Sequence, residues 1–228
     1  MFAELSPDDK AKYVAAKRAV NFVEDGMKLG LGTGSTAAWM VRCLAERVHK
    51  EGLRIKGVPT SSRTANLARE LGLEVITLDE AGRLDITIDG TDEFDANLNL
   101  IKGGGGALLQ EKIVASASDK MIVIADFGKR VTYLGQFPLP IEVLPMAKSY
   151  VARELTKLGG QPQLRDFKTD NGNLILDVHE LKIIDPIEME TKINQIVGVV
   201  TNGLFAVRPA NILLLATNEG VKTIKKGA

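Results

Sequence analysis

The sequence predicts an α/β fold: a Rossmann-like open, mostly parallel sheet with helices on both faces, plus a smaller ferredoxin-like α+β domain. Short apolar segments alternate with helical segments up to residue 125, which is typical of βαβ units. Beyond residue 137 the order becomes β-α-β-β-α-β, the split arrangement of ferredoxin-like domains. Seven of the 22 glycines lie in two clusters, at residues 30–34 and 103–106, where backbone turns tightly or approaches a ligand.

Capping residues mark the first helix. Ser6 can cap it, Pro7 suits its first position, and Asp8 and Asp9 favour the positive end of the helix dipole, while Gly26 ends the apolar stripe. Further helices are expected at residues 36–50, 63–71 and 107–116, and strands at 28–31, 55–58, 75–78, 84–89 and 121–125. Because the two kinds of segment alternate, we expect parallel strands covered on both faces.

The second part of the chain begins near Phe137-Pro138-Leu139-Pro140. Asn171-Gly172 is a strong hairpin signal between two strands. Strands are expected at 141–144, 163–167, 173–179 and 197–201, and helices at 147–158 and 186–195. A final strand at 212–216 is expected to return to the first sheet. These elements predict a Rossmann-like domain of residues 1–131 plus 206–228 and a small domain of residues 132–205.

Composition argues against several classes of protein. Twenty-nine basic and 29 acidic side chains give a formal net charge of zero, whereas nucleic-acid binders usually carry a basic face. Apolar runs such as 212–216 fall short of the roughly 20 residues of a membrane span, and residues 1–12 contain no apolar signal segment. The only cysteine, Cys43, excludes an internal disulfide and a cysteine zinc cluster. We therefore expect a soluble, intracellular domain without nucleic-acid or membrane partners.

The first candidate motif is the segment from Gly30 to Thr36, between a strand and a helix. Backbone N–H groups and the helix dipole favour an anion there, and Thr33, Ser35 and Thr36 add hydroxyl groups. The segment also fits a loose dinucleotide fingerprint, but the second strand ends without the acidic residue that would hold a ribose. A small phosphorylated metabolite fits better than a dinucleotide. A tight turn without a ligand remains the alternative.

The second motif is Asp89-Gly90-Thr91-Asp92-Glu93-Phe94-Asp95, directly after an apolar strand. Open α/β sheets bind ligands at the carboxyl ends of their strands. Four acids in seven residues could hold a hard metal ion, although their spacing is not that of an EF-hand. A solvated acidic turn is the alternative for Glu93 and Asp95, and it suits Asp89 less because Asp89 ends an apolar strand.

The third motif is Lys102-Gly103-Gly104-Gly105-Gly106-Ala107, followed by Glu111-Lys112. Four glycines leave the backbone N–H groups uncovered, and the helix behind them contributes its positive end. Lys102 adds a full charge, and Glu111 lies one helical turn beyond Ala107. Such a site could hold an oxyanion beside a carboxylate base, and a flexible loop is the alternative.

Several other residues favour a structural interpretation. Residues 126–128 spell a kinase metal motif, but no other kinase signature accompanies them. Cys43 is expected to be a small core residue and Trp39 to pack. The two histidines lack partners for a triad or a metal site. Lys129 follows a strand end and could reach a ligand.

Together the three motifs resemble ribose-5-phosphate isomerase, type A. Residues 32–36, 89–93 and 102–112 agree with that family in order and spacing, and residues 137–143 resemble its proline-rich entry to the small domain. Each motif alone is weak, whereas three in register are specific. Thr91 and Gly106 stand where alanine is also common in the family. The resemblance covers nearly the whole chain.

The resemblance implies an enzyme that interconverts ribose 5-phosphate and ribulose 5-phosphate through an enediolate, in the non-oxidative branch of the pentose phosphate pathway. It implies no metal and no organic cofactor, a cytoplasmic location, and a homodimer or a dimer of dimers. The alternative is a non-catalytic sugar-phosphate-sensing domain of the same fold group. A sensor would not need Glu111, so a turnover assay distinguishes the two.

The resemblance also assigns roles to single residues. The family's catalytic base falls on Glu111, and Lys102 with the loop amides could stabilise the enediolate oxygen. Asp89 is the better choice for moving the proton that opens the sugar ring, and Asp92 for orienting hydroxyl groups. The expected substrate-contacting residues are Thr33, Gly34, Ser35, Thr36, Asp89, Gly90, Thr91, Asp92, Lys102, Gly103, Gly104, Gly105 and Lys129.

Overall fold

The computed structural model describes residues 5–227, and these residues form two compact units. The first unit holds residues 5–90, 113–129 and 210–227, and the second holds residues 91–112 and 130–209. The sequence predicts instead that residues 91–112 belong to the Rossmann-like domain. This predicted domain boundary stays a prediction.

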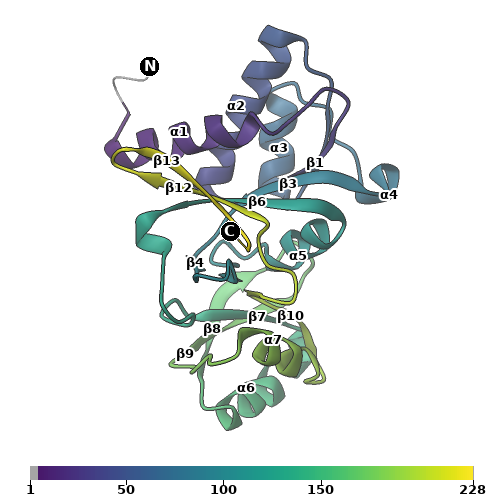
Figure 1. The fold of residues 1–228 in the computed structure, drawn as a ribbon. Helices are drawn as coiled ribbons and strands as arrows, with labels where there is room; N and C mark the ends of the chain where they lie inside the picture. The colour runs from purple at the N-terminus through teal and green to yellow at the C-terminus, as the bar shows by residue number, and fades with distance from the viewer. Residues whose placement is uncertain (1–4, 228) are drawn as a thin grey trace. The chain divides into compact units, whose positions relative to one another are not determined.

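The first unit is built on a six-stranded sheet in the order β13-β12-β6-β3-β1-β2. All neighbouring strands are parallel except β12 and β13, which form the antiparallel hairpin drawn in yellow in Figure 1. The parallel sheet and the return of residues 212–216 to it are therefore confirmed. The bounds are β1 (Lys28–Leu31), β2 (Lys56–Pro59), β3 (Leu84–Gly90), β6 (Ser118–Asp126), β12 (Ile212–Thr217) and β13 (Gly220–Lys225).

Helices cover both faces of this sheet. The first main-chain turn of α1 is held by the predicted cap, because the Ser6 hydroxyl accepts a hydrogen bond from the Asp9 N–H at 3.1 Å. Apolar residues of α1 and α2 share a core with one face of the sheet, and Val114 of α5 packs with Val58 and Leu84 in a second cluster. The helices are α1 (Pro7–Val20), α2 (Ser35–Glu51), α3 (Ser62–Glu70), α4 (Leu78–Ala81), α5 (Leu108–Ser116) and the 3-10 turn η2 (Phe127–Lys129).

The prediction of a strand at residues 75–78 is wrong. Only Val75 makes a bridge, to Gly57, and the chain then enters the short helix α4. The physical reason is a capping box, in which the Thr77 hydroxyl accepts from the Glu80 N–H while the Glu80 carboxylate accepts from the Thr77 N–H. This local exchange of hydrogen bonds starts a helix where the apolar pattern suggests a strand.

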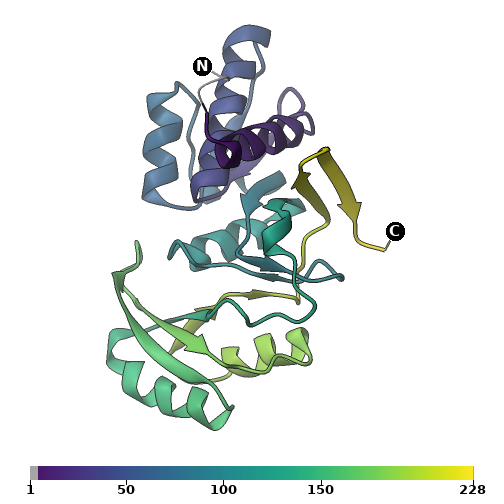
Figure 2. The same ribbon diagram turned by 90° about the vertical axis from the view of Figure 1, so that its left-hand side faces the viewer.

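The second unit contains a four-stranded antiparallel sheet in the order β10-β7-β9-β8. Helices α6 and α7 lie on the same side of it, as Figure 2 shows, and Val151, Leu155 and Ile193 share one core with the strands. This confirms the ferredoxin-like arrangement. The bounds are β7 (Leu139–Val143), η3 (Pro145–Ala147), α6 (Lys148–Lys157), β8 (Gln161–Lys168), β9 (Leu174–His179), α7 (Pro186–Asn194) and β10 (Val199–Asn202).

A three-stranded sheet completes the second unit. It consists of β4 (Glu93–Phe94), β5 (Leu100–Ile101) and β11 (Leu204–Phe205), in the order β11-β5-β4. These strands were not predicted from the sequence, because strands of two residues are too short to show an alternating pattern. The Lys102 N–H extends the pairing by donating to the Gly203 carbonyl at 2.9 Å. The sheet thus fixes the backbone at the start of the second glycine cluster.

Candidate functional site

The first glycine turn of the first unit is shaped by Asp89. The Asp89 carboxylate is 2% exposed, and its Oδ1 accepts from the N–H groups of Thr33 at 3.1 Å and Gly90 at 2.8 Å. A Cβ atom on Gly32 would lie 2.2 Å from that same oxygen. Only glycine therefore fits at position 32, and the carboxylate joins the ends of two neighbouring parallel strands, β1 and β3.

The Thr33 side chain points into a buried group of hydroxyls. Its Oγ1 lies 2.7 Å from the Thr60 Oγ1 and donates to the Ser61 Oγ at 2.8 Å, and the Thr64 hydroxyl donates to the Gly32 carbonyl. Thr33 was predicted as a site residue from the sequence, whereas its three hydroxyl partners were not. The available signal was that Thr60 and Ser61 directly follow β2, and parallel neighbouring strands end at the same edge of a sheet.

Helix α2 begins directly after this turn. Gly34 caps it with a φ of 104°, a conformation that favours glycine, and no side chain among the described residues caps the helix. Ser35 is exposed and Thr36 half-buried, and a Cβ atom on Gly90 would lie 3.8 Å from the Thr36 Cβ. The N–H groups of the first turn and the dipole of a 17-residue helix favour an anion here.

Lys129 belongs to the same edge of the first sheet. It ends η2, which directly follows β6, and β6 is the parallel neighbour of β3. The Lys129 side chain is half-buried. The first unit therefore gathers Gly34, Ser35, Thr36, Asp89 and Lys129 at the carboxyl ends of its strands, as the sequence predicted for a parallel sheet.

In the second unit, Asp92 is tied to the second glycine cluster. Its Oδ2 accepts from the Gly104 N–H at 2.8 Å, and a Cβ atom on Gly104 would lie 2.7 Å from the Asp92 Oδ1. The Thr91 hydroxyl donates to the carbonyls of Glu93 and Ile101. These contacts connect the acidic segment to residues 101–104 and explain the glycine at position 104.

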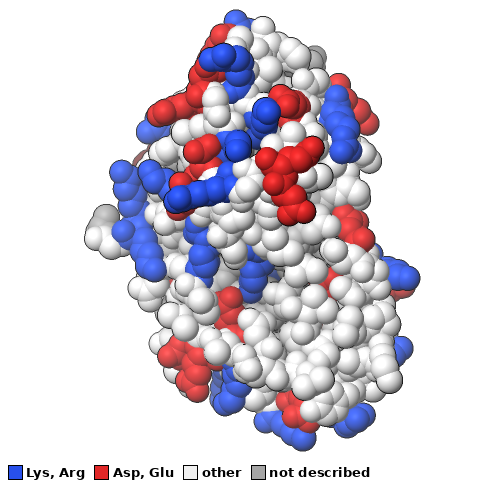
Figure 3. All heavy atoms as spheres, turned by 90° about the vertical axis from the view of Figure 1, so that its right-hand side faces the viewer, with Lys and Arg blue, Asp and Glu red and all other residues white. Residues whose placement is uncertain are grey.

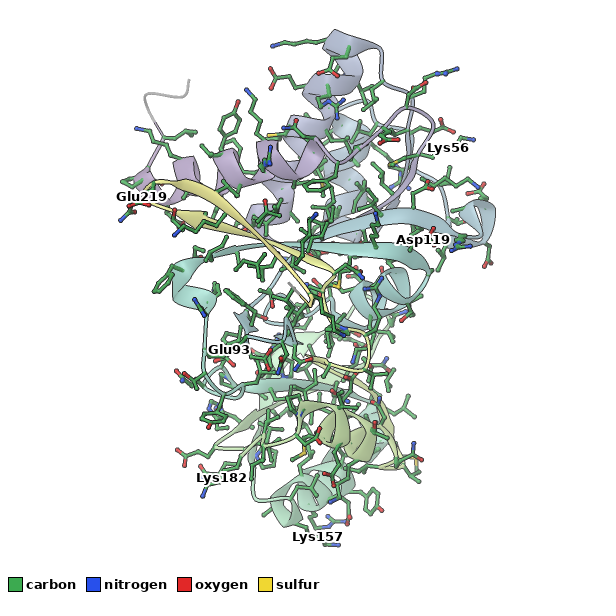
Figure 4. All side chains as sticks on the ribbon, viewed as in Figure 1. Lys56, Glu93, Asp119, Lys157, Lys182 and Glu219 are labelled. Atoms are coloured by element: carbon green, nitrogen blue, oxygen red, sulfur yellow. The ribbon has the colours of Figure 1, made fainter. Side chains whose placement is uncertain are left out.

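The alternative interpretation of Glu93 and Asp95 as part of a solvated acidic turn is wrong, since both side chains are buried. The Glu93 carboxylate, labelled in Figure 4, accepts from the N–H groups of Gly135 and Phe137. Burial raises the pKa of Glu93 above its usual value, and these backbone hydrogen bonds oppose the rise. The Asp95 carboxylate accepts from the backbone and side chain of Asn99. Both acids hold loops in place.

The glycine loop from Gly103 to Gly106 has two positions with positive φ. Gly103 has a φ of 103° and Gly106 a φ of 79°, and the Gly106 N–H donates to the Gly103 carbonyl at 3.0 Å. A Cβ atom on Gly106 would lie 2.3 Å from the Phe167 ring. The loop is therefore a closed turn with a fixed shape, and it leads directly into α5.

Glu111 and Lys102 form a buried ion pair beside this loop. The Lys102 Nζ and the Glu111 Oε1 are 3.5 Å apart, and the side chains are 2% and 7% exposed. Glu111 lies in the first turn of α5, where the helix dipole favours a negative charge. Two opposite charges held together out of water can bind, stabilise and exchange a proton with a polar ligand. This is the carboxylate and cation pair that the sequence predicted.

A second ion pair, Lys112 with Glu190, lies next to the first along α5, with side chains 19% and 6% exposed. The Lys112 Nζ donates to the Glu190 Oε1 at 3.0 Å and to the carbonyls of Asn202 and Leu204. Burial lowers the pKa of Lys112, and Glu190 opposes that change. Phe205 lies near both lysines, with its ring centre 4.7 Å from the Lys112 Nζ and 5.7 Å from the Lys102 Nζ. Neither Glu190 nor Phe205 was predicted from the sequence.

The structural interpretations of other residues are confirmed. Cys43 is buried in the core of the first unit, and burial raises the pKa of its thiol to about 11, which makes it a poor nucleophile. Trp39 packs edge-on against Tyr13. The Asp126 carboxylate accepts from the Gly128 N–H, so this segment forms a local turn.

Among residues 5–227, no group of three or more His, Cys, Asp or Glu side chains is placed to hold a metal ion. Over the same residues, no helix has both the length and the apolar character needed to cross a membrane. Figure 3 shows Lys and Arg interspersed with Asp and Glu over the face in view. That distribution agrees with the balanced charge of the sequence.

Comparison with known proteins adds independent findings. The family model for ribose 5-phosphate isomerase A (phosphoriboisomerase A) matches residues 56–220. The ribose-5-phosphate isomerase A of Ruegeria pomeroyi is 62% identical over 217 residues, which cover 90% of this chain and 83% of the relative. The crystal structure of ribose 5 phosphate isomerase A from Neisseria gonorrhoeae has a TM-score of 0.94 at 44% identity, covering 99% of this chain and 100% of that one.

A further solved structure carries a ligand. It is a D-ribose-5-phosphate isomerase in complex with phospho-erythronic acid, with a TM-score of 0.93 at 42% identity, covering 95% of this chain and 98% of that one. Family model, relative and structures agree with one another over most of the chain. They also agree with the motifs on which the sequence resemblance rests.

Proposed function

The chain belongs to the ribose 5-phosphate isomerase A family and interconverts ribose 5-phosphate and ribulose 5-phosphate, and we propose that Glu111 is the base of this reaction. An aldose becomes a ketose when a proton moves from C2 to C1 through an enediolate. A carboxylate held near both carbons can take the proton and return it. The observation that carries the proposal is the buried Glu111 carboxylate, which follows the glycine loop and lies 3.5 Å from the Lys102 ammonium.

Lys102 is proposed to stabilise the enediolate oxygen. Negative charge develops on this oxygen as the C2 proton leaves, so a fixed positive charge lowers the barrier most when water is excluded. The Lys102 side chain is 2% exposed, and its backbone is paired to Gly203, so little reorganisation is required. The amides of Gly103, Gly104 and Gly105 are proposed as further donors.

The two aspartates are proposed to prepare the sugar. Asp89 is assigned the proton transfer that opens the ring, and Asp92 the orientation of hydroxyl groups. Both carboxylates are held by backbone N–H groups, Asp89 by Thr33 and Gly90 and Asp92 by Gly104. These hydrogen bonds fix the orientation of the two carboxylates.

The substrate phosphate and hydroxyl groups are proposed to contact the glycine turns. The start of α2 supports binding of an anion, because its N-cap residue is Gly34, which has no side chain to accept hydrogen bonds from the first-turn N–H groups. We further propose that phospho-erythronic acid binds this chain, since its carboxylate carries the negative charge that an enediolate would carry. The proposed contact residues are Thr33, Gly34, Ser35, Thr36, Gly90, Thr91, Lys129 and the residues named above.

The family membership does not favour the alternative of a non-catalytic sugar-phosphate sensor. The reaction belongs to the pentose phosphate pathway. A cytoplasmic location, a homodimer or dimer of dimers, and a mechanism without metal or organic cofactor are proposed on the sequence resemblance.

Turnover of ribose 5-phosphate by Glu111→Gln tests the proposed base. Glutamine keeps the shape of the side chain but cannot accept the C2 proton, so kcat should fall by about 10²–10⁴-fold. Glu219→Gln is the matched control, because Glu219 is exposed in the turn between β12 and β13 (Figure 4). A Glu111→Gln variant that is folded and retains the kcat of the control would refute the assignment.

A further inference from the structure

Arg165 makes contacts that the reaction described above does not yet use. It lies on β8 of the second unit and forms a two-pronged ion pair with Asp177 of β9, with Nε to Oδ2 at 2.8 Å and Nη2 to Oδ1 at 2.6 Å. The two side chains are 19% and 21% exposed. Because Arg and carboxylate planes match in this geometry, Asp177 fixes the orientation of the guanidinium group.

The remaining guanidinium nitrogen of Arg165 contacts the glycine loop. Its Nη1 donates to the carbonyls of Gly103 and Gly104, each at 3.1 Å. These carbonyls belong to two consecutive peptide groups. Gly104 and Gly105 are exposed and carry no side chains, and glycine is the residue with the greatest backbone freedom. Arg165 is thus a side chain that restrains this exposed part of the loop.

Restraining a carbonyl also orients the following N–H group. In a trans peptide the C=O and N–H groups point in opposite directions, so the N–H groups of Gly104 and Gly105 are directed away from Arg165. The Gly104 N–H donates to the Asp92 carboxylate at 2.8 Å. One guanidinium therefore determines where two loop amides point, and through one of them it also restrains Asp92.

We propose that Arg165 is a positioning residue for the isomerisation, which orients the peptide groups of Gly103–Gly105 and, through the Gly104 amide, the Asp92 carboxylate. The inference rests on the proposed function, in which this loop supplies donors to the enediolate. Asp177 neutralises the charge of Arg165. The role of Arg165 is therefore to hold the loop rather than to attract the substrate phosphate.

Arg165→Lys is the variant that tests this role. Lysine keeps the positive charge but lacks the planar fork, so it cannot bind Asp177 in two places and both carbonyls at once. Misplacing reacting groups by about 1 Å can cost roughly 10²-fold in rate. We expect kcat to fall by about that factor while KM for ribose 5-phosphate changes less than about threefold. The affinity for phospho-erythronic acid should fall together with kcat.

Arg153→Lys is the matched control. Arg153 is exposed on α6 of the same unit, and the same substitution there should leave kcat, KM and inhibitor affinity unchanged. If Arg165→Lys does not fold, Asp177→Asn serves as the second variant. It leaves Arg165 in place but weakens its orientation, and it should lower kcat in the same direction by a smaller factor.

Two outcomes would overturn the inference. One is an Arg165→Lys or Asp177→Asn protein that is folded and has the kcat and inhibitor affinity of the control. The other is a loss of kcat that only follows the fraction of unfolded protein in thermal unfolding scans. A wild-type protein that does not isomerise ribose 5-phosphate would instead refute the proposed function, so the two failures are distinguishable.

Discussion

Two lysine–glutamate pairs lie within the second unit, and they differ in the distance between their charged atoms. In the Lys112–Glu190 pair the ammonium contacts the carboxylate at 3.0 Å and two carbonyls, and the Glu190 Oε2 accepts from the N–H groups of Ala206 and Val207. In the Lys102–Glu111 pair the charged atoms are 3.5 Å apart. That distance exceeds the roughly 2.7–2.9 Å of a strong charge-assisted hydrogen bond.

We propose that this difference separates a structural ion pair from a reactive one. Burying two charges is costly, and the cost is offset when further hydrogen bonds match the remaining donors and acceptors. Lys112 and Glu190 meet this condition with backbone groups that cannot move, so the pair anchors α5 to β10 and β11. The longer contact between Lys102 and Glu111 fits a pair whose partners change when a substrate enters.

The largest expected effect concerns the anchoring pair. Glu190→Gln replaces a carboxylate that accepts from three donors with a single amide oxygen, and it leaves the Lys112 charge, on a side chain that is 19% exposed, without a counter-ion. Breaking a fully buried pair costs about 3–5 kcal/mol in the free energy of unfolding, and because Lys112 keeps some contact with solvent we expect the lower end of that range. Denaturant titration followed by circular dichroism measures this cost. Glu111→Gln should lose less stability, because Glu111 forms the longer ion pair. If Glu111→Gln lost more stability than Glu190→Gln, the comparison of the two pairs would be wrong.

The second prediction concerns Lys102, the cation of the pair that we propose to be reactive. Lys102→Met should lower kcat by about 10²–10³-fold, the usual loss when one donor to a developing oxyanion is removed. Substrate affinity should fall as well, since Lys102 is proposed to contact the bound sugar. Lys157→Met is the control, because that side chain is 71% exposed at the end of α6 (Figure 4). Steady-state kinetics that are equal for the two variants would remove Lys102 from the reaction.

A smaller effect is expected at the start of α2, where neither pair is altered. Ser35→Ala combined with Thr36→Ala should weaken sugar-phosphate binding by about 1–3 kcal/mol, if hydrogen bonds to a charged group are lost. Calorimetric titration with phospho-erythronic acid measures this change. Ser149→Ala with Thr191→Ala is the control, because both side chains are exposed on helices of the second unit. Unchanged affinity in the folded double variant would exclude these hydroxyls from the substrate contacts.

The last prediction is that removing metal ions has no effect on kcat. If Lys102 and the loop amides stabilise the enediolate, kcat should be unchanged after exhaustive treatment with EDTA. The comparison would break if EDTA abolished turnover and Mg²⁺ or Mn²⁺ restored it. A metal ion would then supply the positive charge that is assigned to Lys102.

Local patterns predicted most of the fold. The β1 strand has the bounds expected from the sequence, α2 extends one residue beyond the expected range at each end, and the apolar segment 212–216 returns to the first sheet. The strand expected at 75–78 failed because the exchange of hydrogen bonds between Thr77 and Glu80 outweighed a short apolar pattern. Strands β4, β5 and β11 have two residues each and leave no periodic signal.

The candidate site was predictable where its residues lie in glycine-rich or acidic motifs, as Asp92 and Glu111 do. The supporting residues were not predictable, because their partners are distant in the chain. Glu190 is 78 residues from Lys112, and Arg165 is 61 residues from Gly104. A single arginine or glutamate in a strand or helix carries no signal of such a contact.

Solvent deuterium incorporation at C1 of ribulose 5-phosphate tests the central claim most directly. The wild-type protein should introduce deuterium, because a protonated Glu111 can exchange with solvent before it returns the proton. Folded Glu111→Gln should show at most about 1% of that rate, in line with the loss of a general base. Incorporation close to the wild-type rate would contradict the account and would mean that another group, with Asp89 and Asp92 the first to examine, removes the proton.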